Sequence, residues 1–400
     1  ETNGIHHDLE RNMWPWRDWV IKAFNDNLRY DHFVTWQLAG DLLPEPTYEQ
    51  QLATAFNRNH RTTQECGSLD EEFRVSYVVD RTNTFGKAFM GLTLECAQCH
   101  DHKYDPISQG EYYQLFAFFN QVPEKGVTQS FKGKFNYNQQ SAPYLELPEE
   151  DVEKLRKYID EQVTTEYAKG STQDEDKMYL DNWKAEMEAM LQPVMIMKDR
   201  DTVRPTFILE RGLYDSPGEE VTFGTPQSIL PFHPDLPRNR LGLAKWLFDP
   251  ENPLTARVLV NRYWQMIFGR GLVDTPDDFG SQGALPTHPA LLDDLAAEFI
   301  ESGWDVKRLL KTMVMSATYQ QASSVDESQL AFDPENRWLG RGSQQRLTAE
   351  MLRDQTLQMS GLLTVQLGGP SVKPFQPEGL WTQVSSGGRY QRKYMTAHGT

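Results

Sequence analysis

The chain contains the stretch DEEFRVSYVVDRTNTFGKAFM at residues 70–90. Its apolar side chains recur at three- and four-residue spacing, as the buried face of an amphipathic helix requires. Ser68, followed three residues later by Glu71, forms a capping-box pattern that would start this helix. The predicted helix ends near Met90 and delivers the chain to the most distinctive motif of the sequence, Cys-Ala-Gln-Cys-His at residues 96–100.

Helical spacing also dominates most of the remaining chain. The further helices expected are 16–24, 31–38, 47–56, 111–120, 149–168, 174–191, 239–248, 255–268, 288–302, 305–320 and 347–363. Residues 206–209 and 220–223 have strand composition and flank a turn sequence at 215–218, which predicts one hairpin. The expected fold is mainly α, with two helical domains joined by a charged helical hairpin and a small β-hairpin.

Shifts in composition divide the 400 residues into three predicted parts. Residues 1–125 carry the cysteine motif, residues 126–200 form a charged helical insert, and residues 201–400 form a second helical domain. The insert has narrow apolar stripes on highly charged helices, as a solvated spacer would. The chain starts at Glu1 without an initiator Met, so we expect a piece of a longer polypeptide whose second domain is truncated at its carboxyl end.

The charge of the chain limits its partners. There are 40 Lys+Arg against 57 Asp+Glu, a formal net charge of −17. Binding to nucleic acid depends on positively charged surface, so no nucleic-acid partner is expected. No apolar run approaches the length of about 18 residues that a bilayer-spanning helix needs, so no transmembrane segment is expected. The 20 Phe, 16 Tyr and 10 Trp argue for a packed aromatic core.

Cys-x-x-Cys-His is the attachment sequence of c-type haem. The thiols of Cys96 and Cys99 would add to the two vinyl groups on one edge of the porphyrin, and His100 would then reach the iron. Two candidates are expected for the sixth iron ligand, His60 and Met90. The sequence therefore favours haem c as the cofactor.

The same cysteines suit a second cofactor. Cys66, Cys96 and Cys99, together with His100 or His102, would provide the three thiolates and one imidazole of a structural zinc site. A redox-active dithiol is a third interpretation, although no thioredoxin-like pattern surrounds the motif. If haem binds, His102 is too close to His100 in sequence to reach the opposite haem face. We expect it to lie near the haem site without binding the iron.

Several segments resemble known families. Three segments resemble a planctomycete-type cytochrome domain of unknown function, PSCyt2 (DUF1549). They are FNRNH at 56–60, residues 70–84, and GLTLECAQCHDHKYDP at 91–106. Three further segments resemble its usual companion, PSD1 (DUF1553). They are RNRLGLAKWL at 238–247, NPLTARVLVNRYW at 252–264 and FGRGLVDTPDDFG at 268–280.

This resemblance implies an exported protein in an oxidising setting, periplasmic or at the cell surface, where haem c is attached. It also implies a redox partner, either a separate protein or a preceding cytochrome domain. One departure concerns Cys66, where the family pattern commonly has Gly; a Cys there adds either a metal ligand or an unpaired thiol.

A second group of chemistry-bearing residues lies in the predicted second domain. It comprises Arg257, Asn261, Arg262, Trp264, Asp277 and Asp278. Guanidinium groups, carboxylates and an indole together suit sugar binding through bidentate hydrogen bonds and an apolar stacking face. The alternative is an ion-paired helix-to-loop junction with Trp264 in the core.

These observations lead to one expected function and its alternatives. We expect an extracytoplasmic c-type haem protein that transfers electrons, or that forms part of an oxidoreductase acting on polysaccharide-derived substrates. The alternatives are a zinc-stabilised carbohydrate-binding or hydrolytic module and a structural interaction protein. Whether the chain is an enzyme stays open at this point.

Overall fold

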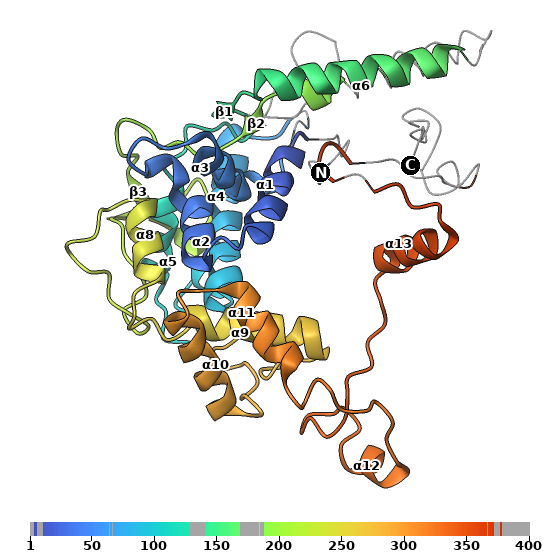
Figure 1. Cartoon of the computed structure of the whole chain (residues 1–400). Coiled ribbons are helices and arrows are strands. Elements are labelled where there is room, and N and C mark those ends of the chain that lie inside the picture. Colours follow the sequence, from blue (N-terminus) through green and yellow to red (C-terminus); the bar gives the residue numbers. More distant parts are fainter. Residues whose placement is uncertain are drawn as a thin grey trace.

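The computed structural model describes residues 4–5, 11–63, 65, 67–127, 141–168, 184, 188–365, 367–371 and 377. In this part the chain is mainly α-helical, with two small antiparallel two-stranded sheets, which confirms the predicted fold class (Figure 1). No helix among these residues has both the length and the apolar character that crossing a membrane requires.

The amino-terminal half consists of short helices around one long one. Its elements are α1 (Trp14–Asn25), α2 (Tyr30–Ala39), η1 (Gly40–Leu42), α3 (Tyr48–Ala53), η2 (Thr54–Arg58), α4 (Asp70–Phe85), the π-turn η3 (Gly86–Met90), η4 (Glu95–Gln98) and α5 (Gln109–Phe119). Helix α4 and its π-turn therefore cover the stretch whose periodicity predicted a helix.

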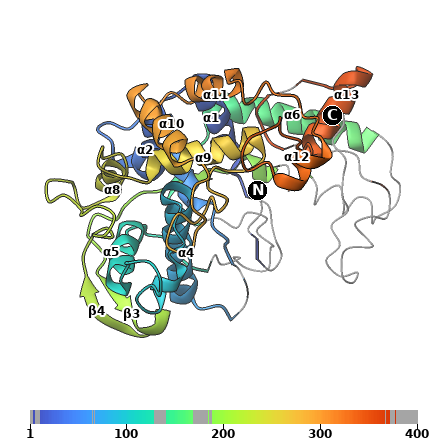
Figure 2. The same ribbon diagram turned by 90° about the horizontal axis from the view of Figure 1, so that it is seen from below.

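The carboxyl-terminal half adds further helices and one hairpin. Its helices are α8 (Arg240–Leu247), α9 (Thr255–Phe268), α10 (Pro289–Glu301), α11 (Val306–Met315), α12 (Glu327–Phe332) and α13 (Ala349–Ser360). The hairpin pairs β3 (Thr206–Leu209) with β4 (Pro217–Val221) and lies beside α5 (Figure 2). Between the halves, α6 (Glu149–Ala168) is followed by the 3-10 turn η5 (Ala189–Leu191), and β1 (Tyr144–Leu145) pairs with β2 (Val194–Met195).

Local sequence signals explain several helix starts. Thr47 and Gln50 form the predicted capping box of α3, and Ser108 with Glu111 forms a second one at α5. The predicted cap of α4 by Ser68 is wrong, because Leu69 is the N-cap residue and no side chain caps the helix. Three acidic residues in the first turn of α4 instead complement the positive end of its macrodipole.

Other sequence predictions differ from the structure in detail. Strand β4 spans Pro217–Val221, so Pro217 and Gly218 belong to the strand and not to the turn. Helix α11 ends at Met315 because Ser316 turns to an extended backbone, whereas the periodicity extended it to residue 320. The β1–β2 pair and α12 have too few residues to produce a periodic pattern and were not predicted. The predicted second insert helix, 174–191, lies mostly outside the described residues.

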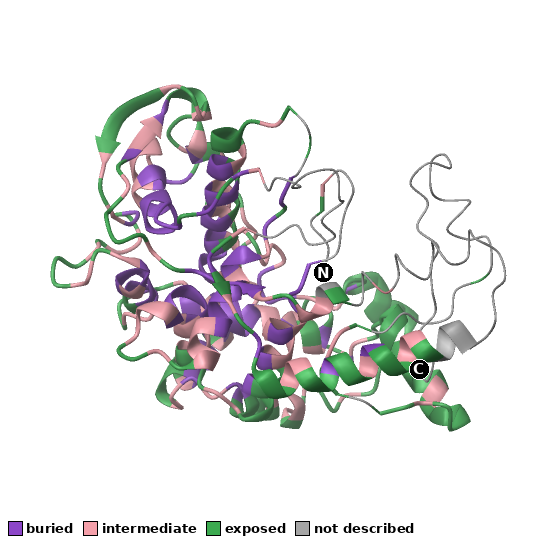
Figure 3. Ribbon diagram, turned by 90° about the horizontal axis from the view of Figure 1, so that it is seen from above, coloured by how far each residue is buried: buried purple, intermediate pink, exposed green. Residues whose placement is uncertain are grey.

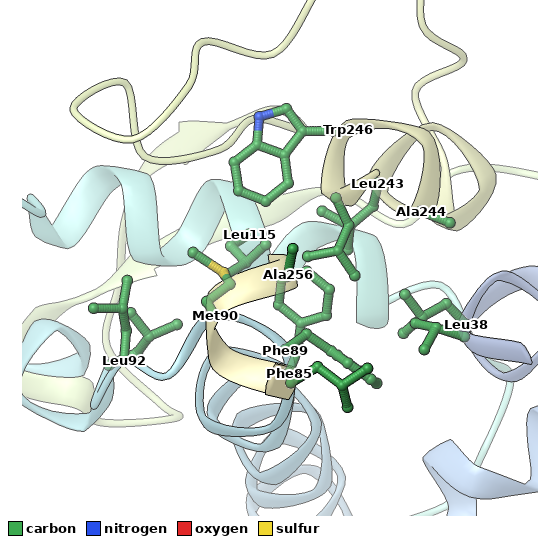
Figure 4. Close-up of a cluster of buried hydrophobic side chains, with 14 of the residues drawn as sticks. Leu38, Phe85, Phe89, Met90, Leu92, Leu115, Leu243, Ala244, Trp246 and Ala256 are labelled. Carbon is green, nitrogen blue, oxygen red and sulfur yellow. The ribbon is translucent and has the colours of Figure 1, made fainter. Parts of the chain in front are cut away.

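The largest buried cluster of side chains includes residues from both sides of the predicted domain boundaries. Figure 3 shows the buried residues in purple, gathered where the helices pack together. In the close-up, Trp246 and Leu243 of α8 gather with Leu38 of α2, Phe85 of α4 and Leu115 of α5 (Figure 4). The boundaries drawn at 125 and 200 stay a prediction. The two helical halves nevertheless share one continuous apolar core.

A buried arginine reinforces this junction. Arg240, the first residue of α8, is fully buried and donates hydrogen bonds to both carboxylate oxygens of Asp41 at 2.7 and 2.8 Å. It also binds the carbonyl of Leu38 and the carboxylate of Asp199. The guanidinium group therefore joins α8 to the segment that follows α2.

Replacing Arg240 by Ala should lower the free energy of unfolding by about 3 kcal/mol, because two acidic side chains lose their buried partner. The matched control is Arg308→Ala, which removes an arginine 3.4 Å from Glu298 on the surface and should cost less than about 1 kcal/mol. Urea denaturation of both variants measures the difference; equal costs would show that the Arg240 junction does not stabilise the fold.

Candidate functional site

The cysteine–histidine motif forms a tight turn at the surface. Element η4 contains Cys96, and Cys99 directly follows it. Between the two cysteines Ala97 is completely buried, whereas both cysteines and His100 are exposed. Within the described residues neither thiol is in a disulfide. The motif thus presents two thiols and one imidazole to the outside of the molecule.

Helix α5 fixes the backbone of this turn. The carbonyl of Gln98 accepts hydrogen bonds from Gln109 Nε2 and from the Tyr113 hydroxyl, both at 3.0 Å. The carboxylate of Asp101 accepts one from the backbone N–H of Gln109 at 2.8 Å. Since α5 is itself buried in the core, the motif is held on a rigid support.

The orientation of His100 bears directly on metal binding. Its Nδ1 lies 2.7 Å from the carbonyl oxygen of Asp101, so Nδ1 carries the proton and donates it to that carbonyl. The lone pair of the neutral imidazole is then on Nε2. Histidines that ligate metals commonly donate their other ring N–H to a carbonyl or carboxylate in this manner.

Residues of the carboxyl-terminal half contact the chain just before the motif. Gly91 has a left-handed backbone (φ 58°), and a Cβ there would lie 2.9 Å from carbons of both Phe279 and Val258. Its carbonyl accepts a hydrogen bond from the N–H of Phe279 at 2.7 Å. Arg262 donates to the carbonyl of Lys87 at 2.6 Å. The segment between α4 and the motif therefore packs against α9 and the loop after it.

A similar contact holds the chain just after the motif. The Asp105 carboxylate accepts a hydrogen bond from the N–H of Ser281 at 2.6 Å, and the Ser281 hydroxyl donates to the carbonyl of Tyr104. The side chain of His102 is buried at this turn, where its Nδ1 accepts a hydrogen bond from the N–H of Asp105 at 2.9 Å. The supporting role of His102 stays a prediction.

The remaining metal-ligand candidates lie in different surroundings. Met90 is completely buried in the shared core, close to Leu92 and Leu115 (Figure 4). Cys66 lies outside the described residues. Among the residues that the structure describes, no three or more His, Cys, Asp or Glu side chains gather as a metal-binding group.

The chemistry of the donor set fits a haem c. Two cysteines outside any disulfide, with the buried Ala97 between them, are followed by an imidazole whose Nε2 carries the lone pair. The sulfur of Cys99 also lies beside Gly212, where a Cβ would approach it to 3.0 Å. Because Gly212 has no side chain (φ 75°), the loop of the β3–β4 hairpin can pass this close to the thiol.

The sugar-binding candidates in the second half all have partners inside the protein. Their pairings are Arg257 with Asp293, Asn261 with the backbone of Val273, Arg262 with Asp277, Trp264 stacked on Phe268 at 4.0 Å, and Asp278 with the N–H of Gly280. Arg262, which also binds Asp277, donates the hydrogen bond to the carbonyl of Lys87 described above. This arrangement has the form of the ion-paired junction that was the alternative interpretation, and sugar binding there stays a prediction.

A buried charge cluster around Glu124 was missed by the sequence reasoning. Glu124 lies between two buried arginines: Arg81 of α4 donates to both of its carboxylate oxygens, and Arg58 Nε lies 3.6 Å from one of them. Arg58 also binds the carbonyls of Ile196 and Ser141. One available signal was Arg81 itself, which falls on the apolar face of α4 between Val78 and Phe85.

His60 belongs to the same cluster. Its ring stacks on Tyr77 at 4.3 Å, its Nδ1 lies 2.9 Å from the carbonyl oxygen of Arg61, and its Nε2 lies 3.6 Å from the Glu124 carboxylate. Both ring nitrogens thus face protein groups. Burial lowers the pKa of His60 below its ordinary value, although Glu124 acts in the opposite direction.

The pKa of Glu124 is shifted strongly. Burial alone would raise it, but the positive charges of Arg81 and Arg58 outweigh burial and hold the pKa well below its usual value of 4.5. The carboxylate is therefore ionised at neutral pH and balances charges that would otherwise be buried without a partner.

Glu124→Gln should lower the free energy of unfolding by about 3 kcal/mol at pH 7, because two buried guanidinium groups lose their counter-charge. A group with a depressed folded-state pKa stabilises the protein above its unfolded-state pKa and loses that contribution as the pH falls. The difference between wild type and variant should therefore shrink below about pH 4.5.

Glu150→Gln is the matched control, since Glu150 pairs with Lys154 on the exposed surface of α6. Denaturant unfolding at several pH values should show a much smaller change for this variant, because solvent screens an exposed ion pair. A Glu124→Gln cost that stays constant from pH 7 to pH 3 would contradict the assignment of Glu124 as the ionised centre.

Two segments of the chain match models of known families. Residues 1–124 match PSCyt2, described as a protein of unknown function (DUF1549), and residues 239–399 match PSD1, described as a protein of unknown function (DUF1553). No curated protein and no solved structure matches the chain. The chain therefore belongs to the proteins in which a PSCyt2 region precedes a PSD1 region.

Proposed function

We propose that this chain is an extracytoplasmic c-type haem protein that transfers electrons. Haem c would be attached through Cys96 and Cys99, with His100 as the iron ligand. The observation that carries the proposal is the hydrogen bond from His100 Nδ1 to the carbonyl of Asp101, which leaves Nε2 as the free ligand atom of an exposed imidazole beside two free thiols.

The protein's own contribution is a rigid support for the motif. Gln109 and Tyr113 hold the carbonyl of Gln98, and Asp101 holds the first N–H of α5. From the other half of the molecule, Arg262 binds the carbonyl of Lys87 before the turn and Ser281 binds the carboxylate of Asp105 after it. The bound haem would supply a one-electron redox centre.

The exposed position of the motif favours exchange of electrons with a partner. Cys96, Cys99 and His100 are all at the surface, so a group attached there would be accessible to a second redox centre. We propose that this partner is a separate redox protein or a preceding cytochrome domain. The intramolecular partners of Arg257 and Arg262 make this role better supported than a substrate-oxidising role centred on those residues.

Zinc is the second candidate cofactor. An imidazole with its proton on Nδ1 and its lone pair on Nε2 suits a zinc ion as well as a haem iron. The fourth ligand would have to be Cys66, which makes the two proposals separable by mutation.

The chain, exported in cells that attach haem c, should retain haem after denaturation and show the absorption bands of a c-type pyridine haemochrome. Cys96→Ser and Cys99→Ser should each weaken attachment, and the double variant should abolish it, because the thiols form the covalent links. Cys66→Ser is the matched control and should keep its haem. A colourless protein with bound zinc that Cys66→Ser loses would overturn the haem proposal.

We also expect the haem spectrum to be unchanged in His60→Gln. Both nitrogens of His60 face Glu124 and the carbonyl of Arg61, so the ring is engaged within the protein. Absorption spectroscopy of oxidised and reduced protein tests this expectation, with a folding control by circular dichroism. Loss of a low-spin spectrum in the folded variant would identify His60 as the sixth ligand.

A further inference from the structure

One face of α4 lines a cavity of about 730 Å³, and a second cavity of about 250 Å³ adjoins it. The two share His60, Asp80 and Thr84 as lining residues. The larger volume falls within the range of about 300–1,000 Å³ typical of small-molecule sites. None of the three motif residues Cys96, Cys99 and His100 lines either cavity.

The cavity wall is built from regularly spaced polar side chains. Ser76, Asp80, Asn83 and Thr84 recur at three- and four-residue intervals and so lie on one face of α4, while Val78 on another face enters the core. The helix therefore presents hydroxyl, amide and carboxylate groups to this cavity.

The charges around the larger cavity are balanced. Its lining contains two cations, Arg61 and Lys87, and two carboxylates, Asp80 and Glu95. Lys87 and Glu95 form an ion pair with each other. In the smaller cavity, the charge of Arg81 is already matched by Glu124. The four charges that line the larger cavity sum to zero, which favours a neutral ligand.

The smaller cavity combines aromatic rings with polar side chains. Trp16 and Phe56 line it, with ring centroids 6.2 Å apart. Asn57, Asn59 and Asp80 add amide and carboxylate groups to its lining. Together these groups can both donate and accept hydrogen bonds.

A ligand that matches this wall must both donate and accept hydrogen bonds and offer an apolar face to aromatic rings. Hydroxyl groups do both, and a sugar ring has such a face. We propose that the joined cavities beside α4 bind a neutral sugar, with Asp80 accepting hydrogen bonds from its hydroxyl groups. Because Glu95 directly precedes Cys96, the sugar would lie next to the haem attachment motif.

The proposal is tested by titrating the purified full chain with glucose, galactose, mannose and xylose, using saturation-transfer NMR. At least one of them should bind saturably, with a Kd on the order of 1 mM. Asp80→Asn should weaken that binding about tenfold, because the charged hydrogen-bond acceptor is replaced by a neutral one. Asp80 is exposed, so this variant should fold normally, as thermal unfolding will check.

Glu72→Gln is the matched control: it neutralises an exposed carboxylate of the same helix that lines neither cavity, and the Kd should change less than twofold. No saturable binding of any of the four sugars, or an unchanged Kd in Asp80→Asn, overturns the proposal. So does tighter binding of glucuronate than of glucose, which would indicate an anion site.

Failure of this proposal is distinguishable from failure of the haem proposal. The Cys96→Ser/Cys99→Ser double variant, which cannot attach haem, should bind the sugar with the same Kd as wild type. Sugar binding that appears only in this variant would assign the cavity to haem and would overturn the sugar site.

Discussion

The buried contact of Glu124 with Arg58 and Arg81 is the interaction on which the amino-terminal half depends most. The three residues come from η2, α4 and the segment after α5, so one carboxylate joins elements that are distant in sequence. A charge in the protein interior is tolerated only with a well-placed partner. These elements must therefore keep the relative positions that leave the buried charges paired.

This contact helps to position both the cavities beside α4 and the cysteine motif. His60 and Arg81 line the smaller cavity, and both are held against Glu124. Helix α4, positioned in the same way, forms one wall of the larger cavity and then leads through its π-turn to the cysteine motif. The motif itself is fixed by α5 and by the loop around Ser281, so it does not depend on Glu124 alone.

The fold was largely readable from periodicity, because amphipathic helices such as α4 and α9 repeat their apolar residues at helical spacing. The cysteine motif was readable because its chemistry is local, and every group it needs lies within five consecutive residues. The Glu124 cluster could not be predicted from the sequence, because Arg58 and Glu124 become neighbours only in the folded chain. The partners of Arg262 were unpredictable for the same reason: its hydrogen bond to the carbonyl of Lys87 leaves no trace in the side-chain pattern.

The most direct test of this account is a double-mutant cycle on Arg81 and Glu124, using Arg81→Met, Glu124→Gln and the combined variant. Free energies of unfolding from urea denaturation at pH 7 give the coupling between the two side chains. We predict a coupling energy of about 2–3 kcal/mol, with the double variant less destabilised than the sum of the single ones. Additivity within about 0.5 kcal/mol would contradict the central place given to this buried pair.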